Sequence, residues 1–389
     1  MPRLLIALAL AVALAGCDTS EPPAAFGCEV PPAPAEPSRF LAMGYFVGFG
    51  PGITANGLVV GTTADGVTDT LAAYPYEGVH GEFFYSDPHP RGGVVSSTRR
   101  PVGGQERSRL DVRAPDGATR TLDFAGPDYV FVPRWRPDGA RVLFVLGEVA
   151  EPRWSLVEWD PGTGATRTVV AEDRPIDPRH VPAYAPDGRS VAYQDGPFYD
   201  GDLFVADVAT GARVRLGARD GVRLFSRGFH PVRWSGDSRW VVSYGERQVT
   251  ADSVSVGFYA ARADGSGVVE VAYDSVSVSE VAGWLPGQDC VVFRSTDDHA
   301  YVGDLRGGSR RLSAERLPGI SGVNVFERTL RPQYALTPGG GRMAMFHRTV
   351  RENRSVVTVV DLSPFAVRQV PLAPVGPDNE YRLADWIGP

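Results

Sequence analysis

A repeat of about 50 residues runs through most of the 389-residue chain. Each copy begins with an aromatic residue or leucine, followed by a short turn; residues 135–139, for example, read Trp-Arg-Pro-Asp-Gly. The repeated position, called the anchor below, is occupied by Tyr85, Trp135, Tyr184, Trp234, Trp284, Leu336 and Trp386. A regular spacing of this length indicates one supersecondary unit used many times.

Each unit contains two predicted hairpins. The Pro-Asp-Gly segment is a tight turn between the anchor strand and an apolar strand such as 141–145, because proline presets φ and glycine accepts positive φ. A second hairpin follows in phase, as in 156–169, and its counterparts are 58–71, 110–122, 203–216, 258–271, 301–312 and 356–370. Four antiparallel strands per unit and seven units predict an all-β, seven-bladed β-propeller.

The two ends of the repeat complete each other. The first unit has a strand at 40–48 and an outer hairpin at 58–71 but no inner strand, whereas 381–387 is an inner strand with nothing after it. We therefore expect the C-terminal strand to close the first blade, which leaves no open inner edge.

The anchor segments resemble the WD40-like (PD40) repeat of the TolB family, whose consensus is roughly Trp-Ser-Pro-Asp-Gly followed by a strand. The resemblance covers residues 40–389 and implies a propeller. The chain departs from TolB in lacking the α/β domain that precedes that propeller, so the resemblance does not imply a role in the Tol system.

The N-terminus resembles a bacterial lipoprotein signal peptide. An 11-residue apolar run, 4–14, follows Arg3 and leads into Leu14-Ala-Gly-Cys17, which is similar to a lipobox. The resemblance implies a lipid on Cys17 and an envelope protein held on the periplasmic side or at the cell surface. The alternative is an ordinary cleaved signal peptide with an incidental cysteine. The predicted organisation is a signal peptide (1–16), a lipidated Cys and Pro/Ala-rich tether (17–39) and the propeller (40–389).

Two further cysteines leave a disulfide open. Cys28 lies in the tether and Cys290 begins the second strand of a later unit. An envelope protein occupies an oxidising compartment, so the two thiols could pair, or they could be unrelated.

Charge and motifs argue against several functions. The net charge is −7 without a basic stripe, which disfavours nucleic-acid binding. We find no Gly-x-Ser-x-Gly elbow, Walker motif or His-Glu-x-x-His motif in the sequence, and the sequence indicates no cofactor. Loop carboxylates such as Asp195, Asp202 and Asp297 lack a fixed calcium-ligand spacing and read as solvated turn residues.

The remaining candidates lie on one predicted face. Short turns share one face, and we expect longer loops on the other, including 47–57, 98–108, 171–183, 217–233, 244–257 and 313–333. There His180, His230 and Glu280 each precede an anchor by four residues. Three interpretations stay open: the side chains form a ligand-binding rim, they bind a metal, or they line the mouth of the channel without a function.

The sequence supports two hypotheses about function. The first is a monomeric, membrane-tethered, non-enzymatic module that binds protein, peptide or glycan on the long-loop face. The alternative is a propeller enzyme, such as a metal-dependent polysaccharide lyase or hydrolase, with its site on the same face.

Overall fold

The computed structural model describes most of the chain. It describes residues 26–35, 39–46, 55–62, 68–75, 85–91, 93–102, 105–114, 116–124, 128–148, 154–172, 181–196, 201–225, 232–273, 276–317, 333–349, 354–371 and 379–387. In these ranges the regular elements are β-strands, apart from one short 3-10 turn, η1 (Ala218–Asp220).

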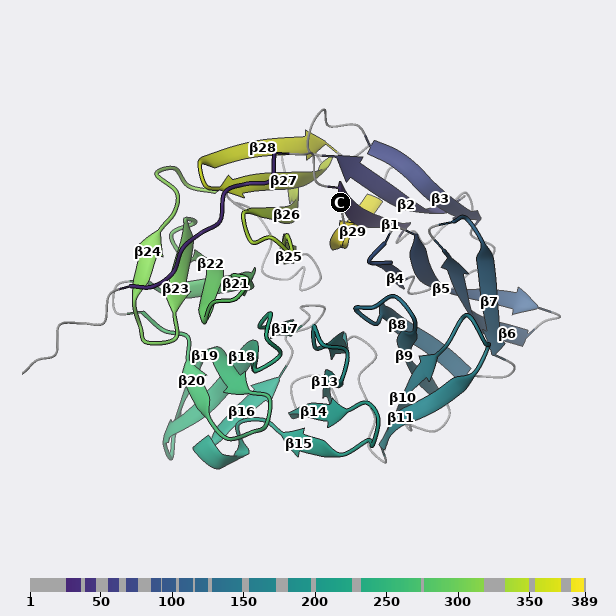
Figure 1. The fold of residues 1–389 in the computed structure, drawn as a ribbon, viewed down its shortest axis with the longest axis horizontal. Helices are drawn as coiled ribbons and strands as arrows, with labels where there is room; N and C mark the ends of the chain where they lie inside the picture. Colours follow the sequence, from purple (N-terminus) through teal and green to yellow (C-terminus); the bar gives the residue numbers. More distant parts are fainter. Residues whose placement is uncertain are drawn as a thin grey trace, which may run out of the picture.

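The described strands form seven antiparallel sheets, arranged as blades around a central axis (Figure 1). Blade 1 contains β29 (Asn379–Ile387), β1 (Arg39–Phe46), β2 (Ala55–Thr62) and β3 (Thr68–Pro75); blade 2 contains β4 (Tyr85–Pro88), β5 (Val94–Val102), β6 (Gln105–Arg113) and β7 (Thr119–Phe124); blade 3 contains β8 (Asp128–Trp135), β9 (Val142–Glu148), β10 (Trp154–Trp159) and β11 (Thr166–Glu172); blade 4 contains β12 (Ala183–Tyr184), β13 (Ser190–Gln194), β14 (Leu203–Asp207) and β15 (Arg213–Arg215); blade 5 contains β16 (Val222–Phe225), β17 (Arg233–Trp234), β18 (Trp240–Thr250), β19 (Ser253–Arg262) and β20 (Val268–Glu270); blade 6 contains β21 (Val278–Trp284), β22 (Cys290–Ser295), β23 (Ala300–Asp304) and β24 (Ser309–Arg311); and blade 7 contains β25 (Gln333–Leu336), β26 (Arg342–Thr349), β27 (Arg354–Leu362) and β28 (Phe365–Pro371). The seven-bladed propeller predicted from the repeat is confirmed.

Blade 1 is built from both ends of the described chain. The last strand, β29, pairs antiparallel with β1, from Arg39 opposite Ile387 to Phe46 opposite Asn379. The predicted closure is therefore present, and the inner edge of β1 is paired.

The core lies between neighbouring blades. In β9, residues Val142 to Val145 are all fully buried, because alternate side chains enter two different interfaces. Leu143 and Val145 pack between blades 3 and 4, whereas Val142 and Phe144 pack between blades 2 and 3. A continuous apolar run is thus the expected sequence of a strand covered on both faces.

The first turn of blade 3 shows why the repeat contains glycine. Gly139 has φ of 72°, and a Cβ placed on it would lie 2.5 Å from Nε2 of His89 in blade 2. Glycine therefore serves both the turn and the close approach of the neighbouring blade. The turns between first and second strands and between third and fourth strands share one end of the disc, called the turn face below; the opposite end is the loop face.

Blade 5 differs from the four-stranded unit that the repeat predicts. Both β16 and β17 pair with β18, so its inner strand consists of two separate pieces. Three segments expected to be loops contain regular structure: 98–108 and 244–257 belong to the hairpins β5–β6 and β18–β19, and 217–233 contains η1 and β16. Residues such as Ser253 to Val256 alternate between polar and apolar, which is the pattern of a β-strand. The loop prediction for 244–257 is therefore wrong.

Residues 26–35, called the N-terminal strap, belong to the predicted tether but lie against blades 6 and 7 (Figure 1). The backbone N–H of Glu29 donates to Oε1 of Gln288 (2.8 Å), and Nε2 of Gln288 donates back to the Glu29 carbonyl (2.7 Å). In blade 7, the N–H of Ala33 donates to the Ser363 carbonyl at 2.8 Å. The strap therefore follows the turn face across two blades.

A disulfide fixes the strap to blade 6. Cys28 and Cys290 are bonded, with Cα atoms 5.9 Å apart and both residues buried. The sequence leaves open whether these two thiols form a disulfide, and in the structure they do. Val30 and Phe26 pack beside the disulfide against the core between blades 6 and 7.

Candidate functional site

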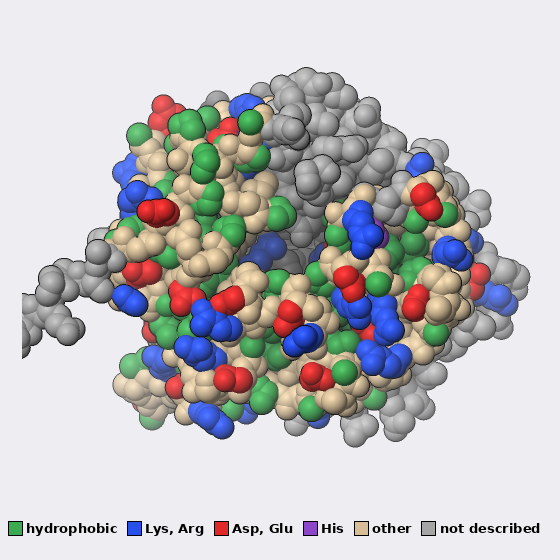
Figure 2. Space-filling view, in the orientation of Figure 1, with side chains coloured by type: hydrophobic (Ala, Val, Ile, Leu, Met, Phe, Trp, Pro, Cys, Tyr) green, Lys and Arg blue, Asp and Glu red, His purple; other side chains and the backbone are tan. Residues whose placement is uncertain are grey.

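The described residues enclose a pocket of about 450 Å³ on the axis of the propeller, at the turn-face half of the central channel. Figure 2 shows the disc hollowed near its centre, with arginine side chains visible inside the hollow. Inner strands and first turns of blades 2 to 7 contribute to the lining. The pocket thus joins six of the seven repeats.

One repeat position accounts for much of this space. The residue directly before the anchor is Arg134, Ala183, Arg233 and Gly283 in blades 3 to 6, and all four line the pocket. Equivalent positions of a propeller form a ring around its axis. The two small residues alternate with the arginines and leave room between them.

Aromatic and proline rings form the walls. The anchors Trp135, Tyr184, Trp234 and Trp284 line the pocket, with prolines of the first turns closing its rim: Pro137, Pro186, Pro286 and Pro338. Indole Nε1 of Trp234 donates to the Ala183 carbonyl of blade 4 at 2.9 Å. Indole Nε1 of Trp284 likewise donates to the Arg233 carbonyl of blade 5 at 2.9 Å. The rings of Trp234 and Trp284 are therefore each held in place by the preceding blade.

Tyr184 is positioned by a buried carboxylate. Its hydroxyl donates to Glu158 of blade 3 at 2.6 Å, and Arg141 and Arg167 donate to the other carboxylate oxygen. Burial opposes the charge of Glu158, but the three donors outweigh it and hold the pKa of this carboxyl below its usual value. Burial and the bond to Glu158 raise the pKa of Tyr184 far above the ordinary phenol value, so the hydroxyl stays protonated.

The charged lining residues are two arginines and one aspartate. Asp87 of blade 2 accepts a hydrogen bond from Arg134 and, at 2.8 Å, from the backbone N–H of Trp135. A bulge in β8 at Val132, which has φ of 43°, shifts the register just before Arg134 and sets where this side chain leaves the strand. Arg233 crosses from blade 5 to donate to the Tyr334 carbonyl in blade 7. The lining carries a formal charge of +1, two cations against one anion.

The predicted rim on the loop face is described only in part. Cys17, His180 and His230 lie outside the described residues. Glu280 is half-buried on β21 and does not line the pocket. Burial raises the pKa of the Tyr334 hydroxyl in blade 7 and the charge of Glu280 adds to that rise, while Arg294 opposes it. Glu280 thus lies near the neighbouring blade, and the three-residue set stays a prediction.

The carboxylates considered for calcium have partners within the protein where they are described. Asp195 accepts from the N–H of Asp202 at 2.9 Å, and Asp202 pairs with Arg215. Asp297 accepts a hydrogen bond from the Ser295 hydroxyl. Within the described ranges, no group of three or more His, Cys, Asp or Glu side chains is arranged to hold a metal, and no helix is long and apolar enough to cross a membrane.

Known proteins resemble this chain in fold but not closely in sequence. No protein-family model matches the chain, and no curated protein matches it. Among solved structures, a prolyl endopeptidase is similar to this chain, with a TM-score of 0.50 and 15% sequence identity. The likeness covers 75% of this chain and 43% of that one. TolB from Acinetobacter baumannii gives 0.47 with 14% identity, over 86% and 79% of the two chains. The periplasmic gluconolactonase PpgL of Pseudomonas aeruginosa gives 0.48 with 14% identity, over 89% and 99%. At 15% identity, the likeness to the prolyl endopeptidase shows the fold alone.

The sequence contains one signal for the pocket that motif patterns do not detect. Arg134 and Arg233 occupy the same repeat position, directly before an anchor tryptophan. An alignment of the repeats that includes the residue directly before the anchor, as well as the residue four positions before it, reveals both arginines.

Proposed function

We propose that this chain is a lipid-anchored, non-enzymatic envelope module that binds an extended peptide segment carrying a carboxylate in its channel pocket. The observation that carries the proposal is the lining itself: four aromatic anchors and a rim of prolines surround Arg134 and Arg233. Proline and aromatic rings pack well against aliphatic and planar groups, and a guanidinium recognises carboxylates through paired N–H donors.

The size of the pocket supports a segment of a larger ligand. A cavity of about 450 Å³ falls within the range of small-molecule sites, so it can hold a few side chains at the end of a chain. The rigid blades preform the walls, which lowers the entropy cost of binding. The lipid anchor rests on the lipobox-like segment at Cys17 and supplies the location in the envelope.

The strap fits the same proposal. Eight residues, 18–25, separate Cys17 from the first strap residue in the sequence. Such a linker spans at most about 25 Å in an extended polyproline conformation. The strap leaves along the turn face, so a lipid on Cys17 would hold the pocket close to the membrane that carries it, and ligands would be membrane-proximal proteins.

The proposal is tested with arrays of peptides that end in a free carboxylate and matched arrays that end in an amide, alongside an acidic-glycan array. We expect the purified mature protein to bind carboxylate peptides, with quenching of the pocket tryptophans. Arg233→Gln removes the guanidinium but keeps a polar side chain, and it should weaken binding about tenfold or more. Arg215→Gln, which alters an ion pair in blade 4, is the matched control.

Equal binding of the carboxylate and amide peptides, or equal loss in both variants, would contradict the proposal. A stoichiometric divalent metal in the purified protein, together with selective binding of acidic glycans, would favour the enzymatic alternative.

A further inference from the structure

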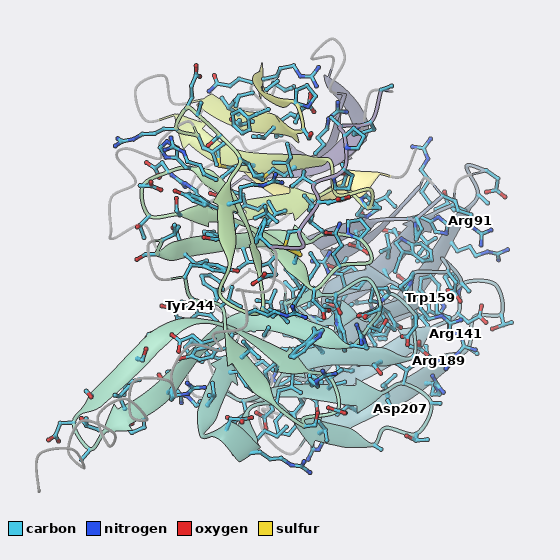
Figure 3. All side chains as sticks on the ribbon, turned by 60° about the vertical axis from the view of Figure 1, so that its left-hand side comes forward. Arg91, Arg141, Trp159, Arg189, Asp207 and Tyr244 are labelled. Atoms are coloured by element: carbon cyan, nitrogen blue, oxygen red, sulfur yellow. A yellow bond between two sulfur atoms is a disulfide. The ribbon has the colours of Figure 1, made fainter. Side chains whose placement is uncertain are left out.

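A second candidate surface lies on the loop face, away from the pocket. The hairpin β18–β19 is formed by strands of 11 and 10 residues, about twice the length of β13 and β14, with five residues each, in the neighbouring blade. Figure 3 shows a long pale-green hairpin that extends from the disc on the side opposite the turns of Arg91, Arg141 and Arg189. Its tip therefore lies beyond the body of the propeller.

The tip is unusually apolar. Four large hydrophobic side chains are exposed among the described residues, and three of them lie here: Val249 (62% exposed), Val254 (46%) and Val256 (51%). On β19, Val254 and Val256 continue the face of Phe258 and Ala260, which pack into the core between blades 5 and 6. An apolar stripe thus runs from the core into solvent, which marks an interaction site when it is contiguous.

The same strand has an open edge. The strand β20 pairs with β19 from Tyr259 to Ala261, and the N–H of Val271 donates to the Phe258 carbonyl at 2.8 Å. No described strand pairs with this edge between Ser253 and Gly257. Since alternate residues direct their N–H and C=O to the same edge, Val254 and Val256 present theirs on the open side with Phe258.

The five residues of this edge carry none of the features that normally protect one, although Asp252 precedes them and the Glu270 carboxylate of β20 lies near Gly257. Residues 253–257 read Ser-Val-Ser-Val-Gly, with no proline and no charged side chain. Natural sheet edges carry charges, prolines or bulges that prevent pairing with other chains. An exposed edge in which Val254 and Val256 alternate with small residues is suited to accept a further strand.

The dimensions favour an extended segment over a second copy of this chain. Five residues span about 17 Å, and two strands are about 10 Å wide, so one face of the tip covers about 170 Å². A stable protein–protein interface requires about 800 Å² from each partner. A single strand that pairs with the backbone and places apolar side chains over Val254 and Val256 uses the edge and the face together.

We propose that the edge of β19 from Ser253 to Gly257 is a docking site for an extended strand of a partner protein, which adds to blade 5 with apolar residues at alternate positions. The site is independent of the channel pocket, because it lies on the opposite face and shares no residue with the pocket lining.

The test selects random peptides against the purified mature protein. We expect enriched peptides with apolar residues at every second position, and hydrogen exchange should show new protection at Val254 and Val256. Val256→Pro removes an outward N–H without removing a donor to β18, and it should weaken binding about tenfold or more. Val256→Thr keeps the backbone and the branched shape and should retain most of the affinity.

The control is Arg215→Pro, because Arg215 is exposed on the outer strand β15 of blade 4 and, unlike Val214, directs its N–H away from β14. Each variant is first shown to unfold at the wild-type temperature; if Val256→Pro does not, Val256→Glu takes its place. Peptides that bind the edge variant as well as wild type would overturn the proposal, as would the absence of enriched peptides. A concentration-dependent dimer, or vesicle binding, that Val256→Glu abolishes would assign the tip to another occupant.

Discussion

The bond between Cys28 and Cys290 should contribute measurably to stability, and its removal gives a sharp test of the strap. The disulfide joins residues 262 positions apart, so it closes a very long loop in the unfolded chain. In the chain-entropy model such a loop corresponds to an upper value of about 5.6 kcal/mol, and measured losses for native disulfides are about 2–5 kcal/mol. With an unfolding entropy of about 2.1 cal/mol/K per residue over roughly 350 residues, Tm should fall by about 3 to 7 °C.

The assay compares Cys28→Ser with wild type by thermal unfolding, with and without a reductant. Reduced wild type should match the variant, and Cys290→Ser should match both. Hydrogen exchange adds a local measurement: the Ala33 amide, which donates to the Ser363 carbonyl, should lose protection, whereas Val292 in β22 should keep it. An unchanged Tm together with an unchanged exchange rate at Ala33 would refute the view that the disulfide holds the strap on blades 6 and 7.

Four further outcomes are expected. Deletion of 379–387 removes all eight paired positions of β29 on β1, so urea unfolding should show a loss of several kcal/mol or no folded monomer. Trp284→Ala removes a buried ring between blades and should cost about 3–5 kcal/mol by the same measurement. Burial lowers the pKa of His89, and the charge of Arg91 lowers it by a smaller amount. The stability that the neutral His89 ring contributes is therefore present above about pH 6.5 and is lost as the pH falls below that value. The difference in Tm between wild type and His89→Gln should accordingly narrow from pH 8 to pH 5. Cys17→Ser should release the protein from the membrane fraction and remove the lipid mass, and an unmodified wild-type N-terminus would contradict the lipoprotein hypothesis.

The repeat predicted the propeller because each unit solves the same packing problem. An anchor aromatic, a turn and an apolar strand such as 141–145 recur since every blade must bury both faces against neighbours. Closure by 381–387 followed from counting strands, and the strand β29 confirms it. These features depend on local pattern and spacing, which a single sequence contains.

Features that depend on the relative position of repeats were harder to predict. The Pro/Ala-rich composition of the tether favoured an extended linker, but its contacts with Gln288 and Ser363 come from residues more than 250 positions away. The segment 244–257, predicted to be a loop, forms a hairpin whose turn, at 251–252, contains neither glycine nor proline to signal it. Its alternation of serine and valine is nevertheless the stronger signal. Alternating polar and apolar residues predict a β-strand in which only one face of the sheet is covered.

The pocket shows how a repeat protein can place chemistry without a motif. Arg134 and Arg233 are 99 positions apart in the numbering, and no local pattern around either residue differs from an ordinary strand end. Rotation about the propeller axis brings the position before the anchor from each blade into one ring, so the ring's composition, rather than any segment, decides its chemistry. Ala183 and Gly283 matter as much as the arginines, because a larger side chain at either position would occupy the space between the charges. In such a fold, function is read by comparing the same position across blades, and departures from the average residue at that position identify the site.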